Sequence, residues 1–362
     1  MLLAACSLAA CQPDATPADA KKTQVESAAS RNEAAPRDAP TTVGLETHVA
    51  PPRPIAREEM SALADAVAEQ GDAHSLAVAA LLRDFGDDKS MLLPGASPNV
   101  VPKPNDKIRK WLDDAERQSP DEVVVLVVAI YLERFDTVRR KALIDRWRAL
   151  EPDNLTPILF AQYPEAQLFD AASSANRYDS HYADFLRAVV GSLLRPSLQA
   201  HVRLIAARSG NTPEEYVVGL ATSYWSLVLM PAFQQILTPC RQQQLADARH
   251  LQCRWIAEIM FRRGDTILTD MIGASMIQRL AETASERQEA QARRREDNWL
   301  MLCMGEAYER EPRAHLKRFA RLLTGTELFT ERSLMRQLVV EAGYPPLPPP
   351  GWDHDSNRRS GQ

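Results

Sequence analysis

Apolar residues recur at helical spacing along most of the chain from residue 55 to residue 344. Residues 55–70 and 73–85 both show the three- and four-residue period, and a glycine follows each run within one residue. Such a pair predicts two antiparallel helices joined by a tight turn. The Pro-punctuated stretch 87–105 comes next and is predicted to be the longest loop of this helical body.

Two segments carry the same helix-start signature. Ser119–Glu122 and Thr212–Glu215 each combine an N-cap hydroxyl, Pro at the first helical position and Glu three residues later, which closes a capping box. Residues 123–131 are apolar on all sides, as a buried strand would also be, but the cap favours a fully buried helix that is too short to span a bilayer. The second signature opens a core helix that runs to Pro231.

The other helices follow the same period. Residues 136–150 are amphipathic, and the stripe predicted to be buried contains Val138, Leu143, Ile144 and Trp147. The polar stretch Ser285–Asp297 is predicted to be a solvated helix end rather than a binding surface. Further helices are predicted around Trp111, from Thr156-Pro157, through Tyr182 to Leu193, and at 247–263, 267 to about 298, 299–309, 314–323 and 332–341.

The amphipathic helix ends in Glu-Pro-Asp-Asn at 151–154, and Thr156-Pro157 then starts the next helix. This ending resembles helix B of a tetratricopeptide repeat, and its distance from Ser119-Pro120 is near the expected period of about 34 residues. The Trp, Leu-Gly and Tyr marks of helix A are absent. The resemblance implies stacked helical hairpins, so the predicted fold is all-α, with antiparallel hairpins packed as an irregular, tetratricopeptide-like bundle over 55–344 and a subdivision near 200–212.

Composition supports an all-helical body. Hydrophobic residues make 45% of the chain, aromatic residues only 6%, and Gly occurs 14 times, a mixture that favours helices over sheets. The net charge of -5 is small, and basic residues are interspersed with acidic ones. A nucleic acid is therefore not an expected partner.

The first eleven residues carry the most specific signal in the chain. They are apolar and small, and Leu8-Ala9-Ala10-Cys11 resembles the lipobox of bacterial lipoproteins, as does Leu3-Ala4-Ala5-Cys6. The resemblance implies that Cys11, or Cys6, carries a lipid after the signal segment 1–11 is cleaved. No Lys or Arg precedes the short apolar stretch, so we expect the true start to lie upstream of Met1.

The segment from Gln12 to Pro54 is rich in Ala, Pro, Thr and Asp and has almost no large apolar residue. It is predicted to be a disordered tether that spans roughly 35 Å root-mean-square. Gln12, where Asp signals inner-membrane retention in many such lipoproteins, indicates the outer membrane, so the predicted location is periplasmic and lipid-anchored. At the other end, residues 345–362 form a Pro-rich tail that is extended at its start.

Three cysteines remain in the body: Cys240, Cys253 and Cys303. A disulfide between the first two needs Cα atoms about 5.5 Å apart, whereas thirteen residues of continuous helix would separate them by about 20 Å. A break is available, because Thr238-Pro239 can end one helix and Asp247 can cap the next. Two alternatives stay open: three buried thiols, and a metal site that includes His250 but lacks a fourth ligand.

The strongest catalytic candidate is His181, which lies between Asp179 and Asp184 and could act as a general base. No Ser or Cys in a nucleophile setting accompanies it, so a half-buried structural histidine is the simpler interpretation. Arg263-Gly264-Asp265 matches a cell-adhesion tripeptide, yet Gly264 is also where one helix should stop and Asp265 or Thr266 cap the next. No cofactor, nucleotide or metal motif is present, so no catalytic residue, metal or cofactor is predicted.

The predicted location and the lack of catalytic motifs together predict an envelope lipoprotein whose helical body binds another protein. Its contact with the membrane is expected through the lipid alone. One alternative is an immunity or inhibitor protein directed against a secreted toxin. The rival class is an envelope enzyme with a dispersed active site, for which a pocket converging on His181 would be the discriminating feature.

Overall fold

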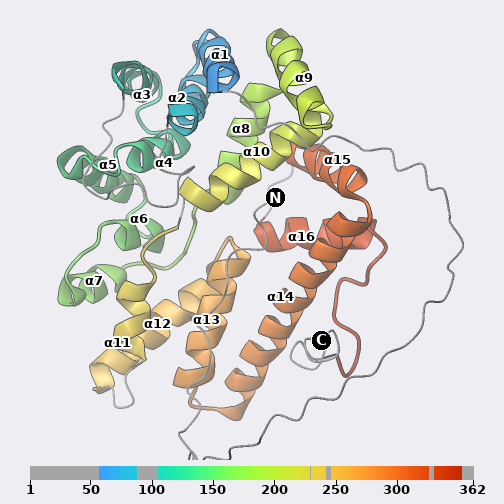
Figure 1. Ribbon diagram of the computed structural model, residues 1–362. Coiled ribbons are helices and arrows are strands. Elements are labelled where there is room, and N and C mark those ends of the chain that lie inside the picture. The colour runs from blue at the N-terminus through green and yellow to red at the C-terminus, as the bar shows by residue number, and fades with distance from the viewer. Residues whose placement is uncertain (1–56, 88–104, 229, 242–245, 326–329, 353–362) are drawn as a thin grey trace, which may run out of the picture. The chain divides into compact units, whose positions relative to one another are not determined.

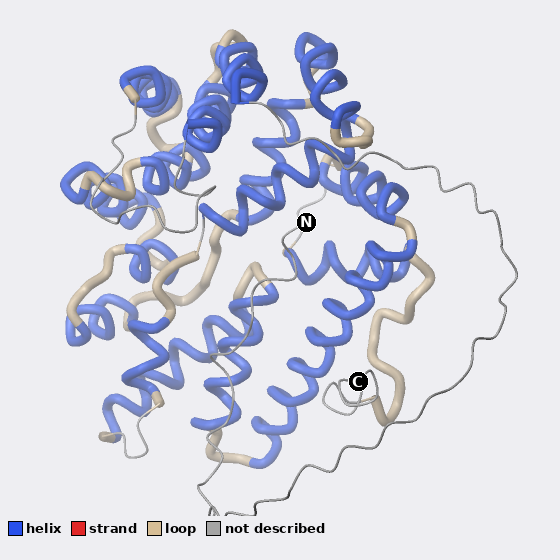
Figure 2. The backbone as a smooth tube through the Cα atoms, in the orientation of Figure 1, coloured by secondary structure: helices blue, strands red, loops and turns tan. Residues whose placement is uncertain are grey.

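A computed structural model describes residues 57–87, 105–228, 230–241, 246–325 and 330–352. Within these ranges the chain forms sixteen α-helices, one short 3₁₀ turn and no β-strand, which confirms the all-α prediction (Figure 1, Figure 2). Cys6, Cys11, the predicted tether and residues 88–104 of the predicted loop lie outside the described residues. None of the described helices combines the length and the apolar character that a bilayer crossing requires.

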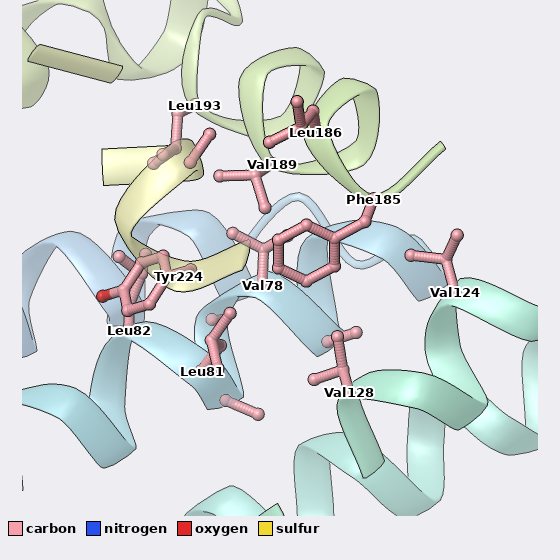
Figure 3. Close-up of a cluster of buried hydrophobic side chains, with 14 of the residues drawn as sticks. Val78, Leu81, Leu82, Val124, Val128, Phe185, Leu186, Val189, Leu193 and Tyr224 are labelled. Carbon is pink, nitrogen blue, oxygen red and sulfur yellow. The ribbon is translucent and has the colours of Figure 1, made fainter. Parts of the chain in front are cut away.

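The larger hydrophobic core joins both ends of the described chain. Figure 3 shows how Val78 and Leu81 of α2, Val128 of α4, Val189 of α8 and Tyr224 of α10 meet in it. Since α4 is buried on all sides, the prediction of a buried helix rather than a strand is confirmed. The helices of this core are α1 (Arg57–Ala68), α2 (Ala73–Asp87), α3 (Asp106–Gln118), α4 (Val123–Leu132), α5 (Thr137–Leu150), α8 (Tyr182–Leu193), α9 (Gln199–Arg208), α10 (Pro213–Val228), α15 (Pro312–Leu323) and α16 (Glu331–Glu341). The turn η2 (Pro196–Leu198) adds Leu198, and Phe160 also belongs to this core.

A second hydrophobic core lies in the middle of the chain. It is formed by α6 (Leu155–Phe160), α7 (Glu165–Ala172), α11 (Gln234–Cys240), α12 (Asp247–Arg263), α13 (Ile267–Leu280) and the start of α14 (Ala284–Arg310). Helices α12, α13 and α14 follow one another side by side (Figure 1). Gly273 allows the close approach of α13 to α12, because a Cβ there would lie 2.5 Å from the backbone nitrogen of Phe261.

A small third cluster connects α13, α14 and α16 through Ile267, Trp299, Cys303 and Val339. The first part of the predicted Pro-rich tail packs here as well. Trp299 Nε1 donates to the carbonyl of Pro345 at 2.9 Å, and the rings of Trp299 and Trp352 meet edge to face at 5.3 Å. Ordered packing thus continues to Trp352, beyond the predicted end of the helical body at 344.

The break between the last long helices differs from the prediction. A single helix, α14, runs through residues 298 and 299, and the break lies at 281–283, where Thr283 and Glu286 form a capping box. The polar stretch 285–297 is only partly solvated. Its beginning is exposed, but Ala290 and Asp297 are fully buried, so the prediction of a solvated helix end is wrong for its last residues.

Two local predictions are also wrong. Ser119 closes α3 instead of opening α4, since its N–H donates to the carbonyl of Ala115, and α4 starts at Val123 without a side-chain cap. Val138 is 80% exposed. Nine residues of helix turn through half a circle beyond two full turns, so Val138 lies opposite the buried Trp147.

The capping box of Thr212 and Glu215 is confirmed, because the Glu215 carboxylate accepts from the Thr212 N–H at 2.8 Å and the Thr212 hydroxyl accepts from the Glu215 N–H at 3.3 Å. Helix α10 ends at Val228, short of the predicted Pro231.

Helices far apart in sequence touch, such as α2 with α8 and α8 with α15, whereas tetratricopeptide repeats contact only their neighbours. Tetratricopeptide-like stacking is therefore not confirmed.

Candidate functional site

Cys240 and Cys253 form a disulfide, with a Cα–Cα distance of 5.7 Å. The predicted helix break makes this bond geometrically accessible, since α11 ends at Cys240 and α12 begins at Asp247. Both sulfur-bearing residues are buried in the second core. The bond ties α11 to α12 and excludes the alternative in which all three thiols are free.

The metal alternative at Cys240, His250 and Cys253 is wrong, because the two sulfurs bind each other. Across the described residues no three His, Cys, Asp or Glu side chains converge in a way that could hold a metal ion. Cys303 is a free thiol in the third cluster, fully buried, and burial raises its pKa to about 12. Its thiolate form is therefore scarce at neutral pH.

His181 lies at the N-terminus of α8, where the turn after α5 meets the segment 176–182. Its Nε2 lies 3.0 Å from Glu151 Oε2, and its Nδ1 lies 3.4 Å from Asp184 Oδ2. Glu151 also accepts from Trp147 Nε1 at 2.7 Å and from Arg177 at 2.9 Å. The imidazole is enclosed, with 13% of its side chain exposed.

The charges around this ring fix its protonation state. Burial alone favours the neutral imidazole, but Asp184, Glu151 and Asp179 outweigh it and raise the pKa of His181 to about 10. Burial alone would raise the pKa of Glu151, but hydrogen bonds from His181 and Arg177 hold it well below its usual value. The pair is an imidazolium and a carboxylate at neutral pH.

An imidazolium whose two ring nitrogens both face carboxylates has no lone pair with which to take a proton. The geometry accordingly assigns His181 to the connection between α5 and α8 and not to general-base chemistry. Asn154 completes this connection, because its side chain donates to the carbonyl of Asp179 at 2.8 Å and accepts from the Asp179 N–H at 3.0 Å.

The Arg263-Gly264-Asp265 tripeptide marks a helix junction. Gly264 ends α12, and the Thr266 hydroxyl caps α13 by accepting from the Thr269 N–H. The Asp265 carboxylate turns inward and accepts from the Ser180 hydroxyl at 2.6 Å. This inward orientation leaves the tripeptide without the outward carboxylate that an adhesion motif presents, and it gives Asp265 a role that local sequence patterns did not reveal.

The described surface has a shallow apolar depression between α7 and α12, with a volume of about 210 Å³. Trp255 and Leu251 stand one turn apart on its α12 side and are 42% and 63% exposed. The lining is formed by Phe169, Ala172, Ser173, Leu251, Gln252, Trp255 and Ile256. Large apolar side chains that cluster around a hollow are typical of binding surfaces.

The Trp255 indole is held in one orientation. Its Nε1 donates to the carbonyl of Ala175 at 3.0 Å, which satisfies the polar end of the ring while the apolar face stays open. Arg249 of α12 reaches across to α7, where its guanidinium lies 3.8 Å from the centre of the Phe169 ring and 3.0 Å from Glu165. The depression is thus a preformed apolar surface with a charged rim.

Sequence reasoning missed this site, although a signal exists. Leu251 and Trp255 share a four-residue spacing that is out of phase with the buried stripe of α12, which contains Cys253, Ile256 and Met260.

The chain matches no protein-family model, no curated protein and no solved structure.

Proposed function

We propose that this chain is an envelope lipoprotein whose helical body binds another protein through the depression between α7 and α12. The observation that carries the proposal is the pair of exposed apolar side chains, Trp255 and Leu251, at the edge of a preformed hollow. Tryptophan is among the residues most enriched at the energetic centre of protein interfaces. The lipid-anchor part of the proposal is supported by the lipobox-like residues before Cys11 and Cys6.

The chemistry of the hollow indicates what the partner presents. Its lining is apolar apart from Ser173 and Gln252, so the matching group is an aliphatic or aromatic side chain. Because the Trp255 ring is already oriented by its bond to Ala175, binding costs little side-chain entropy there. Arg249 and Glu165 at the rim can make polar contacts around the apolar centre.

A pull-down from envelope extract with the tethered body, followed by mass spectrometry, tests the binding function. The variant that combines Leu251→Ser with Trp255→Ala should lose a partner that the wild type retains. Leu204→Ser, which changes a 58% exposed leucine on α9, is the matched control and should retain it. Equal recovery of every partner by both variants would contradict the proposal that the depression is the binding surface.

The lipid anchor is tested separately. Cells fed a labelled fatty acid should incorporate it into the wild-type chain, and Cys11→Ser, or Cys6→Ser if that residue is the acceptor, should abolish incorporation and release the body from membranes. Failure of both substitutions to change either result would contradict the anchor while leaving the depression untouched.

The identity of the partner separates the alternatives. A secreted foreign enzyme recovered with the wild type would favour the immunity or inhibitor function, whereas resident envelope proteins would favour a house-keeping interaction module. The enzymatic alternative gains no support from His181, because both ring nitrogens face carboxylates that raise its pKa to about 10.

A further inference from the structure

The two large hydrophobic cores meet through polar segments. The segment 176–182 connects α7 of the second core to α8 of the first, and it is bound on one side by Glu151 and Asn154 and on the other by Asp265. Asp265 lies in the turn between α12 and α13 of the second core. Polar and ionisable side chains therefore hold this junction, together with the buried rings of Tyr178 and Tyr182.

The Asp265 carboxylate caps a helix that lies 83 residues earlier in the chain. Its Oδ2 accepts from the Ser180 N–H at 2.9 Å, from the Ser180 hydroxyl at 2.6 Å and from the Tyr182 N–H at 3.3 Å, at the start of α8. Its Oδ1 is buried and has no hydrogen-bond partner in the part of the chain that the structure describes. A buried carboxylate oxygen without a donor disfavours the ionised form.

Glu331, the first residue of α16, reciprocates this arrangement. Its N–H donates to the backbone carbonyl of Asp265 at 2.8 Å, and its Oε2 accepts from the Ile267 N–H at 2.8 Å, at the start of α13. Glu331 therefore binds a second backbone N–H at the start of α13, beside the one that Thr266 caps. The two carboxyl groups together bind α8, α13 and α16 at one joint, which we call the Asp265–Glu331 joint.

Acidic and basic groups both surround the joint, and the acidic ones act directly on its two carboxyls. Asp179 raises the pKa of Asp265, and Asp265 and Asp270 raise that of Glu331. The guanidinium of Arg332 is already bound to Asp270 at 2.8 Å and to Asp297. Other ionisable neighbours are Tyr178 and Tyr182 beside the two carboxyls, Arg177 at 3.0 Å from Asp179, and Arg293, Glu296 and Arg336 around Arg332.

Burial is the largest cause of the raised pKa values at the joint. It raises the pKa of Asp265 to about 6 and that of Glu331 to about 7, against the lowering effect of the hydrogen bonds that each accepts. Both carboxyls are thus protonated in mildly acid solution. In an opened joint that water can reach, they would ionise near pH 4.

We propose that the Asp265–Glu331 joint is a pH-sensitive hinge between the two cores, closed in acid solution and loosened as the pH rises to neutrality and above. The sign follows from linkage. A carboxyl whose pKa is higher in the closed state than in the open state contributes stability that is fully present below about pH 4 and is lost as the pH rises through 6 and 7. Two negative charges beside Asp179 and Asp270 then favour opening.

Hydrogen exchange of the full chain, read by mass spectrometry and corrected for intrinsic exchange, tests the hinge. Amides of 264–270 and 330–334 should lose at least about tenfold in protection between about pH 5 and pH 8. The double variant Asp265→Asn with Glu331→Gln should lose this pH dependence. Asp170→Asn and Glu309→Gln, which change exposed carboxyls of the same types, should keep it.

Ser180→Ala keeps the test decisive if the double variant does not fold. The Ser180 hydroxyl lowers the pKa of Asp265, so its removal should move the midpoint of the protection change to higher pH, which a merely structural serine would not do. Equal protection of both segments at the two pH values in the wild type would overturn the hinge. So would a pH dependence that the double variant and Ser180→Ala leave unchanged.

Discussion

His181 combines a left-handed backbone with a charged, enclosed ring. Its φ of 60° lies in the left-handed region, which is uncommon for residues other than glycine although Asn, Asp and His adopt it more often than the rest. Its N–H donates to Asp179 at 2.9 Å. The ring is bound to Glu151 and Asp184. Backbone strain of this kind persists only where surrounding contacts compensate for it, and the two carboxylates supply that compensation.

The substitution His181→Gln should lower the free energy of unfolding by about 3 kcal/mol near pH 6. The pKa of His181 is raised to about 10 in the folded chain. The stabilisation of the fold by the protonated ring is therefore fully present below pH 6.5 and is lost as the pH rises through 10. Urea denaturation of wild type and variant at about pH 6, 8 and 10 measures it. His201→Gln, at an exposed position on α9, should have no such effect; a wild-type advantage that stays constant over this pH range would contradict the ion pair.

Sequence alone placed His181 beside acidic residues but could not assign its partner. Asp179 and Asp184 are neighbours in the chain, whereas Glu151, which lies closest to the ring, is 30 residues away. The same limit applies to Asp265, whose local pattern predicts a cap for α13. Thr266 takes that role, and the Asp265 side chain binds residues that lie 83 and 85 positions earlier.

At the scale of elements, the disulfide between Cys240 and Cys253 is the alternative that the predicted helix break made possible. Replacing Cys240 and Cys253 together by Ala should cost about 3 kcal/mol of stability, because the unfolded chain loses a constraint over a thirteen-residue separation. Denaturant unfolding of the oxidised wild type and the double variant measures this cost. A reductant should destabilise the wild type and leave the variant unchanged; an equal response of both would show that the bond contributes nothing.

Helix starts show where local signals succeed and fail. Thr212 and Thr283 both form capping boxes with a Glu three residues later, although only the first was predicted. The second was hidden because the polar residues after Thr283 continue a helical pattern that the preceding apolar run had begun. Ser119 carries the same signature but closes α3, since the packing of α3 and α4 overrides the weak local preference.

The segment after α16 is predicted to act as a structural strap on α14. Trp352→Ala should lower the free energy of unfolding by about 1 to 2 kcal/mol, because it removes the edge-to-face contact with Trp299. Thermal or urea unfolding followed by tryptophan fluorescence measures the loss. Leu347→Ala removes a 57% exposed side chain from the same segment and should be neutral; a loss no greater for Trp352→Ala than for this control would exclude the strap.

At the scale of the whole described body, periodicity predicted the helices and most of their buried faces but not their partners. The chain passes between the two cores repeatedly: α6 and α7 belong to the second core, α8 to α10 to the first, α11 to α13 to the second, and α15 and α16 again to the first. A helical period identifies the apolar face of a helix, but it does not identify which other helix covers that face. The contacts of α15 with α8 and α10 therefore had no sequence signature, nor did the hollow that α7 and α12 form together.

Arg332 is the side chain on which the connection of α13, α14 and α16 depends most. Its guanidinium binds Asp270 at 2.8 Å and Asp297, while Glu296 lies 3.3 Å away. Arg332→Met leaves the buried Asp297 carboxylate without its partner and Asp270 with only Arg293 at 3.6 Å, which should cost about 3 to 5 kcal/mol. The second core is then expected to unfold before the first, so circular dichroism and tryptophan fluorescence should give two separate urea transitions where the wild type gives one.

The pH dependence of this loss distinguishes the charge network from simple packing. Burial raises the pKa of Asp297 to about 7, so this carboxyl is protonated in mildly acid solution and needs Arg332 less there. The destabilisation by Arg332→Met should consequently shrink from about pH 8 to about pH 5. Arg321→Met, which removes a guanidinium that pairs with Glu341 on the surface, should have little effect on stability at either pH. A single coincident transition for Arg332→Met, with a loss as small as that of the control, would mean that apolar contacts alone hold the two cores together.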